Sequence, residues 1–467
     1  MNNIIFMTNF VLGRMRRIYY MSYPENRKDY KKSRICYSVG DTAAQTIIQL
    51  AGGMYLVTLM NALGISDGNM GIISSIATLA AAAQIISVKL SARLSKNKLF
   101  VCLTVLQKLW LGFIYFIPLM NISNSLKVVL MISCYSLAHI SIQIGTPATV
   151  DWLASLIHSK LRGRYFAKKD SVAVFCTSST TLLMALMLDF LSEENMNLAF
   201  VIIGSVLVLL ALVNFIAFTL MKEPKESITD ENGKEMHGAL ARRKKIEMYQ
   251  NISQSTKFLK EFKIALQSAD FRMMLALNFL WLTAFNVSCP FISSYQIKEL
   301  SLSYTYIMAL GFICTLGRVY LAPKAGVLAD RVGMGKVTRW AMTSLGINLL
   351  LYVFTVPSNA YIMMIPNNIF GALAWTFISV GLLGIQLQLF DENKRIIQFS
   401  LFSVLSGAYG FTVAFLAGKL IDLLQSMDLQ IFGMRVYAQQ ITNLLGVFFV
   451  ILVVLFIRFK IEPRLNG

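Results

Sequence analysis

The residues best suited to chemistry in this chain are the few polar side chains that interrupt long apolar segments. Asp41, Gln45 and Gln49 are spaced four residues apart, which places all three on one face of a helix. A carboxylate beside amides can hold a proton or a cation, or it can hydrogen-bond a polar solute. Because such groups are costly in apolar surroundings, each is a candidate for function.

Further candidates lie in three later apolar segments. They are His139, Gln143, Asn278, Asn286, Asn367, Asn368 and Trp375. An imidazole can relay a proton near neutral pH, and an indole can stack on a sugar or an aromatic drug. The alternative for each is structural, since an amide on a membrane helix often bonds only a neighbouring helix. A lone histidine on an apolar face is more often a satisfied core donor.

The elements that hold these residues are predicted to be membrane-spanning helices, which makes the fold class an all-α membrane protein. Hydrophobic residues make up 56% of the 467 residues and charged residues only 14%, whereas a soluble domain carries roughly 25% charge. The apolar runs reach helix length and do not alternate with a period of two, which disfavours a β-barrel. Twelve spans are expected, at residues 38–62, 70–93, 98–119, 126–149, 171–192, 198–221, 271–295, 303–323, 338–357, 359–388, 396–423 and 433–459.

The net charge of +19 is unevenly distributed along the chain. Lysine and arginine gather in alternate loops, in the N-terminal tail and at the C-terminal end. The positive-inside rule therefore places both termini in the cytoplasm. Such a surplus suits anionic lipids at the cytoplasmic face of the cell membrane, so no nucleic-acid partner is expected.

A polar segment in the middle of the chain divides the spans into six and six. The expected parts are a cytoplasmic N-terminal tail at 1–37, a six-helix bundle at 38–221, a cytoplasmic linker with some helix at 222–270, a second six-helix bundle at 271–460 and a cytoplasmic tail at 461–467. We expect a monomer.

Motifs of enzymes are missing from the sequence. It has no phosphate-cradling Walker loop and neither a His-Glu-x-x-His nor a Gly-x-Ser-x-Gly motif. His139, His158 and His237 lack the spacing of metal ligands. We therefore expect no enzymatic activity, no metal and no cofactor.

The segment from Gly326 to Lys336 joins the eighth and ninth spans. It holds one acid, two bases and three glycines within eleven residues, which we interpret as a tight charged turn. It resembles the loop signature of the major facilitator superfamily, Gly-x-Leu-Ala-Asp-Arg-x-Gly-x-x-Lys. The resemblance implies a fold of two six-helix halves with the substrate site between them near the middle of the membrane. It also implies that the first, fourth, seventh and tenth spans line the cavity, and the polar candidates fall on these spans.

A weaker copy of this motif lies in the second–third loop, where Arg93 aligns with Arg331 but Ala92 replaces Asp330. An asymmetric gate is therefore expected, in which Asp330 contacts the start of the fifth span in the conformation closed to the cytoplasm. A carboxylate is stabilised at a helix N-terminus. The residues assigned to this gate are Gly326, Asp330, Arg331, Gly333, Lys336, Arg93, Arg162 and Arg164. The alternative is that Asp330 merely ends a helix and orients the chain.

Two narrower resemblances concern subgroups of the superfamily. The segments 145–148, 151–153, 162–169 and 437–440 look like an uncharacterised group from Gram-positive gut bacteria of Firmicutes type, which supplies no substrate. Residues 37–41, at the start of the first span, resemble those of melibiose-type glycoside–cation symporters. The second span, however, has no carboxylate at 81–86, where those proteins hold their cation, so sodium coupling of that kind is not expected.

The function expected is secondary transport of a small solute by alternating access, as a proton-coupled symporter or a uniporter. The amides and Trp375 suit a neutral polar solute such as a sugar or nucleoside. The first alternative is a multidrug or metabolite exporter of the same fold. The second is a transporter-like receptor or scaffold that does not transport.

Overall fold

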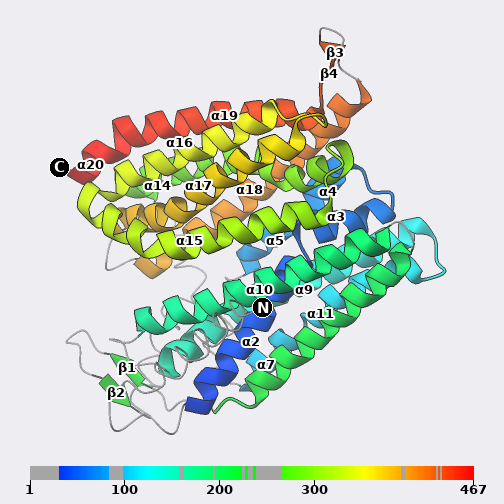
Figure 1. The fold of residues 1–467 in the computed structure, drawn as a ribbon. Coiled ribbons are helices and arrows are strands. Elements are labelled where there is room, and N and C mark those ends of the chain that lie inside the picture. The colour runs from blue at the N-terminus through cyan, green and yellow to red at the C-terminus, as the bar shows by residue number, and fades with distance from the viewer. Residues whose placement is uncertain are drawn as a thin grey trace, which may run out of the picture.

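The structure is a computed structural model that describes residues 31–83, 98–156, 162–192, 195–222, 227–229, 235–237, 264, 266–390, 395–427, 430–431 and 434–466. These residues are almost entirely helical (Figure 1). The first helices are α2 (Lys31–Leu50), α3 (Gly53–Ala62), α4 (Asp67–Ser74), α5 (Ile76–Leu79), η1 (Ala80–Ala83), α7 (Lys98–Leu106), α8 (Leu109–Phe113), η2 (Ile114–Leu119), α9 (Asn124–Leu156), α10 (Arg162–Ser192) and α11 (Met196–Thr219). The later helices are α14 (Ala269–Ser294), η4 (Tyr295–Glu299), α15 (Tyr304–Val332), α16 (Met334–Val353), α17 (Ala360–Leu389), α18 (Arg395–Ser426), α19 (Ala438–Phe456), η5 (Ile457–Ile461) and α20 (Glu462–Asn466).

Most of the expected membrane spans are present as long apolar helices. Within the described residues, nine helices can cross a membrane by length and composition, or ten if the bent pair α2 and α3 counts as one span. That pair bends by 45° next to Gly53, whose φ of +52° favours glycine. Of the two remaining spans, the second is described only to Ala83, and the ninth corresponds to α16, whose first turns carry Lys336 and Arg339.

The helices pack in two groups. Helices α2 to α11 form the first group, in which α2 lies against α10 and α11. Helices α14 to α20 form the second, in which α14 lies against α18 and α19, and α16 against α17. The second group lies above the first in Figure 1. Leu111 and Phe200 belong to the core of the first group, and Phe271 and Leu345 to that of the second.

The two groups meet closely at the end where α4 packs against α18. A Cβ atom added to Gly68 would lie 2.1 Å from the carbonyl oxygen of Gly418, and one added to Gly71 would lie 1.9 Å from the Phe291 ring. Only glycine permits such an approach of two helices. The short antiparallel hairpin of β3 (Gln430–Ile431) and β4 (Met434–Arg435) lies at this end, which we call the hairpin end. We call the opposite end, where α20 lies, the C-terminal end (Figure 1).

Two features differ from the sequence-based expectations. A second hairpin, β1 (Ser227–Thr229) with β2 (Glu235–His237), lies in the expected linker, whose described residues also include helical ones at 264, 266–267 and 269–270. The turn expected over the whole charged motif is confined to Gly333, with a φ of +98°, because α15 continues through Arg331 to Val332 and α16 begins at Met334. Polar residues end the apolar part of a span, but a helix can continue beyond it into water.

Candidate functional site

Asp41 is the centre of a polar cluster between α2 and α10. The Lys169 Nζ lies 2.5 Å from Asp41 Oδ2 and 2.9 Å from Asp170 Oδ1. Gln45 donates its Nε2 to the same Asp41 oxygen at 2.8 Å. The structure thus brings together two residues that the four-residue spacing placed on one face. Gln49 lies one turn further along α2 and is exposed.

A second lysine lies beside this cluster. Lys108, between α7 and α8, is only 8% exposed. Its Nζ donates to Asn214 Oδ1 at 3.0 Å, and the Asn214 amide donates to the carbonyl oxygen of Gly40 at 2.5 Å. Lys108 was not predicted as a site residue, although a lysine inside an apolar run is itself a signal of function. Lys169 was expected in a loop, because the fifth span was expected to begin at residue 171.

The candidates on α9 have a more structural setting. His139 is 7% exposed, and its ring lies 4.4 Å from the ring of Tyr135 one turn earlier, measured between centroids. Gln143 is half-buried one turn further on. The packing of His139 is what its structural alternative predicts, and its role as a proton relay stays a prediction.

The asparagine candidates mainly bond the helices around them. Asn278 donates to Ser406 Oγ on α18 at 2.6 Å. Asn367 forms reciprocal amide hydrogen bonds with Asn348 on α16, at 2.7 to 3.0 Å. The remaining two, Asn286 and Asn368, each donate to a carbonyl oxygen one turn earlier in their own helix, at 2.9 Å. These contacts are the ones expected of structural amides in membrane helices.

Trp375 belongs to an aromatic cluster between α14 and α17. Its ring packs edge to face against Phe285 and Trp281, with centroids 5.5 and 6.0 Å apart. Trp375 and Phe285 remain half-buried. The second group therefore offers aromatic surface where the first offers charge.

A network that was not predicted joins the two groups at the hairpin end. The Asp67 side chain, 1% exposed, lies 2.6 Å from the Nζ of Lys298. Its other oxygen accepts from Gln425 at 2.8 Å and from Gln439 at 3.2 Å. Nearby, Asp422 on α18 accepts from the Gly68 backbone N–H at 3.0 Å. The buried Asp67 carboxylate is stabilised because it is both ion-paired and hydrogen-bonded.

Helices α10 and α15 meet at the same end through another carboxylate. Asp189 accepts hydrogen bonds from the backbone N–H groups of Tyr304 and Thr305, at 2.9 and 2.6 Å. These are free N–H groups at the start of α15, where the helix dipole favours negative charge. Thr58 on α3 also donates to the Tyr304 hydroxyl, at 3.2 Å. Neither acid was predicted as a site residue: Asp67 falls between the first two expected spans, and Asp189 lies near the end of the expected fifth span at 171–192.

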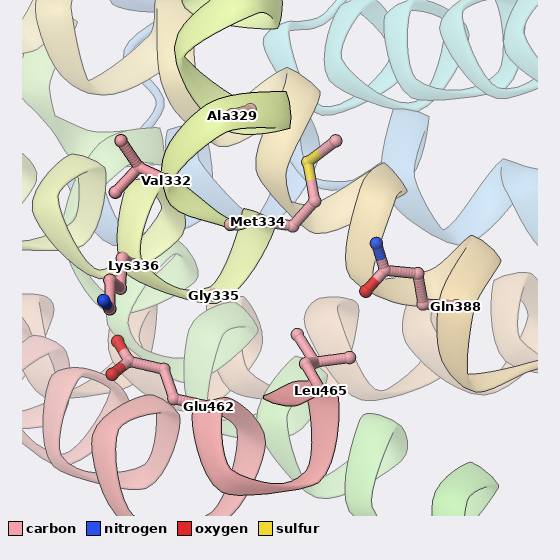
Figure 2. Close-up of a pocket in the computed structure, with 9 residues that line it drawn as sticks. Ala329, Val332, Met334, Gly335, Lys336, Gln388, Glu462 and Leu465 are labelled. Carbon is pink, nitrogen blue, oxygen red and sulfur yellow. The ribbon is translucent and has the colours of Figure 1, made fainter. Parts of the chain in front are cut away.

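The charged motif lies at the C-terminal end, against α20. A small pocket of about 230 Å³ is lined by Ala329, Val332, Gly333, Met334, Gly335, Lys336, Gln388, Glu462 and Leu465 (Figure 2). The Arg339 Nε lies 2.8 Å from Glu462 Oε1, and the Lys336 side chain points toward the same carboxylate in Figure 2. The motif is thus part of the packing within the second group.

The expected gate involves residues that the structure describes only in part. Arg93 and the side chains of Asp330, Arg162 and Arg164 lie outside the described residues, whereas Gly326 lies within α15. Arg331 is exposed. A contact between Asp330 and the start of α10, expected in a conformation closed at the C-terminal end, stays a prediction.

Comparison with known proteins gives the geometry its context. The family model described as Major Facilitator Superfamily matches residues 42–414. A mutant of the nucleoside transporter NupG has a similar structure, with a TM-score of 0.65 at 11% identity, covering 92% of this chain and 100% of that one. A D-xylose-proton symporter gives a TM-score of 0.62 at 13% identity, with coverages of 90% and 96%. A partially occluded, inward-open structure of the xylose transporter XylE from E. coli gives 0.59 at 13% identity, with the same coverages. No protein of curated function matches the sequence.

Proposed function

The chain belongs to the major facilitator superfamily, and we propose that its solute passes between the two helix groups, with the bundles at 38–221 and 271–460 as the moving units. It is a multi-pass membrane protein and a secondary transporter of a small solute rather than an enzyme. Proton-coupled symport and uniport both fit this proposal.

The observation that carries the mechanism is the polar closure at the hairpin end. The pair of Asp67 with Lys298 and the contact of Asp189 with Tyr304 both join one helix group to the other. Alternating access requires such contacts to break when the opposite state forms. The concentration of basic residues in the tails and in 222–270 supports a cytoplasmic C-terminal end in the cell membrane. The described conformation is then closed toward the outside.

The proposed solute path runs along α2, α9, α14 and α17. On the first group it includes Asp41, Gln45 and Gln49, and its best support is the pairing of Asp41 with Lys169 and Gln45. On the second group the half-buried rings of Trp375 and Phe285 support an aromatic wall. Within the superfamily we assign the chain to the uncharacterised group from Gram-positive gut bacteria that residues 162–169 resemble.

Alternation can be tested with a cysteine reporter at each end. In a cysteine-free background, Thr58→Cys places a thiol beneath the Tyr304 contact, where Thr58 is 4% exposed. Val39→Cys places one on α2 toward the C-terminal end, where Val39 is 48% exposed. A panel of sugars, nucleosides, amino acids and drugs is added, and labelling by a membrane-impermeant thiol reagent is measured.

A transported solute should change the two labelling rates in opposite directions. Met120→Cys is the control, because Met120 is 50% exposed after the third span and should label equally in both states. A solute that stabilises the protein but changes neither reporter would favour the receptor or scaffold function instead.

A further inference from the structure

Arg318 is a cation near one end of the apolar span of α15, and the site described above does not use it. It lies in α15, within the apolar span Tyr304–Leu321. Ionisable residues in such a position almost always face the protein interior or a water-filled cavity. It was not predicted as a site residue, and it falls on the eighth span rather than on one expected to line the cavity.

The helical position of Arg318 shows which way it faces. Residues seven or eleven apart lie on nearly the same face of an α-helix. At these spacings from Arg318 lie Ile307, Ala325 and Ala329, which are 8%, 0% and 1% exposed, and Gly311, which is half-buried. Arg318 itself is exposed. The buried positions place Arg318 on the side of α15 that faces the protein, where its own side chain stays exposed.

The depth of Arg318 places it opposite the Asp41 cluster. Helices α10 and α15 are antiparallel neighbours, because Asp189 contacts Tyr304 and Phe175 packs against Phe312 at 6.1 Å between ring centroids. Arg318 lies six residues beyond Phe312, and Lys169 lies six residues before Phe175. At 1.5 Å of rise per residue, both are about 9 Å from the aromatic pair along their helices. Measured from the Asp189–Tyr304 contact, Arg318 is about 21 Å and Lys169 about 30 Å away, so the two lie within about 9 Å of the same depth.

The charges at this depth do not balance among the described residues. Lys169 is paired with both Asp41 and Asp170, and Lys108 is hydrogen-bonded to the Asn214 amide. Arg318 makes no hydrogen bond or ion pair within the described part of the chain. Three cations thus face two carboxylates, and an unpaired charge in a membrane protein costs several kcal/mol unless a partner arrives.

We propose that Arg318 binds the negatively charged group of the solute, which makes the substrate a small anion such as a carboxylate or a phosphate ester. The proposal rests on the proposed function, because it names the substrate class of the same path. A guanidinium presents a planar pair of donors that matches the two oxygens of such groups. The aromatic wall of Trp375 and Phe285 then suits the apolar part of the solute.

The test uses pairs of compounds that differ only by charge. Purified full-length protein is mixed with benzoate or benzamide, succinate or succinamide, and glucose 6-phosphate or glucose, and thermal unfolding and binding are measured. We expect at least one anion to stabilise the protein where its neutral partner does not. Arg318→Gln should weaken its binding about ten- to hundred-fold, as loss of a hydrogen bond to a charged group does, and Arg318→Lys should weaken it less.

Two further variants separate the proposal from its rivals. Lys324→Gln removes an exposed cation six residues further along α15, whose Nζ lies 3.9 Å from the Tyr320 ring centroid, and should leave anion binding unchanged. Asp170 is 55% exposed and is the rival partner for Arg318. If Asp170→Asn and Arg318→Gln impair transport equally while neither changes anion affinity, Arg318 closes a gate and the proposal is wrong.

The results also separate failure of the anion proposal from failure of the proposed transport function. If a neutral solute stabilises the protein and changes the cysteine reporters while no anion does, the substrate is not an anion but transport stands. If no compound of either kind acts on the reporters, the anion proposal and the transport proposal both fail.

Discussion

At the scale of single residues, the structure separates amides that hold helices from groups that remain free to act. Asn348 and Asn367 satisfy each other's buried amides across α16 and α17. Replacing Asn367 with alanine should lower stability by about 1–3 kcal/mol, because Asn348 would lose its partner while remaining buried. Thermal unfolding of the purified protein measures this change.

Asn368→Ala is the matched control for Asn367, since Asn368 bonds only a carbonyl oxygen of its own helix. It should change stability much less. A stable Asn367→Ala protein that no longer transports would instead make Asn367 a ligand of the solute, as the sequence analysis suggested.

The Asp41 carboxylate yields a prediction about coupling. If a proton binds there, Asp41→Asn should abolish the stimulation of uptake by an inward proton gradient while exchange of solute across the membrane persists. The measurement is uptake into liposomes with and without the gradient, and Asp170→Asn is the control because Asp170 shares Lys169 but is 55% exposed. Gradient-driven uptake by the Asp41→Asn protein would place the proton elsewhere, and a lack of stimulation in the unaltered protein would favour uniport.

At the scale of elements, α15 has two caps with different reach. Ser303 accepts from the N–H of Tyr306 in its own chain segment, whereas Asp189 accepts from the start of α15 across the two groups. Ser303→Ala should cost about 0.5–2 kcal/mol of stability in either state. Asp189→Ala should instead weaken only the state closed at the hairpin end, because the other state does not hold the two helices together there.

Labelling of Thr58→Cys distinguishes these two caps. We expect Asp189→Ala to raise its rate and Ser303→Ala to leave it unchanged. Equal effects of both substitutions would mean that Asp189 stabilises the helix itself and has no part in closure.

The elements also show what the sequence could predict. Apolar runs located the helices and the four-residue spacing paired Asp41 with Gln45, because both depend on local periodicity. Helix ends were harder to predict, since charges at 326–332 mark the membrane boundary and not the end of α15. Lys169 and Asp67 were misjudged for a related reason. Their partners, Asp41 and Lys298, are more than a hundred residues away, and only the packing of helices brings them together.

At the scale of the whole molecule, the balance between two states depends on the network at the hairpin end. The Asp67 carboxylate is buried between the groups, with Lys298, Gln425 and Gln439 as its partners from the second group. Asp67→Asn keeps the shape of the side chain but removes its charge, so Lys298 loses its ion pair in this state only. Removing one partner of a buried pair costs about 3–5 kcal/mol. Because the Lys298 side chain is 30% exposed, the free-energy cost here should be smaller.

A free-energy change of about 1.4 kcal/mol already changes the ratio of the two states tenfold. In the absence of solute, Asp67→Asn should therefore raise the labelling rate of Thr58→Cys at least tenfold. Glu299→Gln is the matched control. Glu299 lies at the same end but faces Arg435 of its own group, at 3.8 Å. Because it also follows Lys298 directly, it should shift the ratio, but much less than Asp67→Asn does. The same shift should lower labelling of Val39→Cys, because opening at one end is coupled to closure at the other. Faster labelling at the hairpin end with no change at Val39 would show local fraying, and the two ends would then move independently.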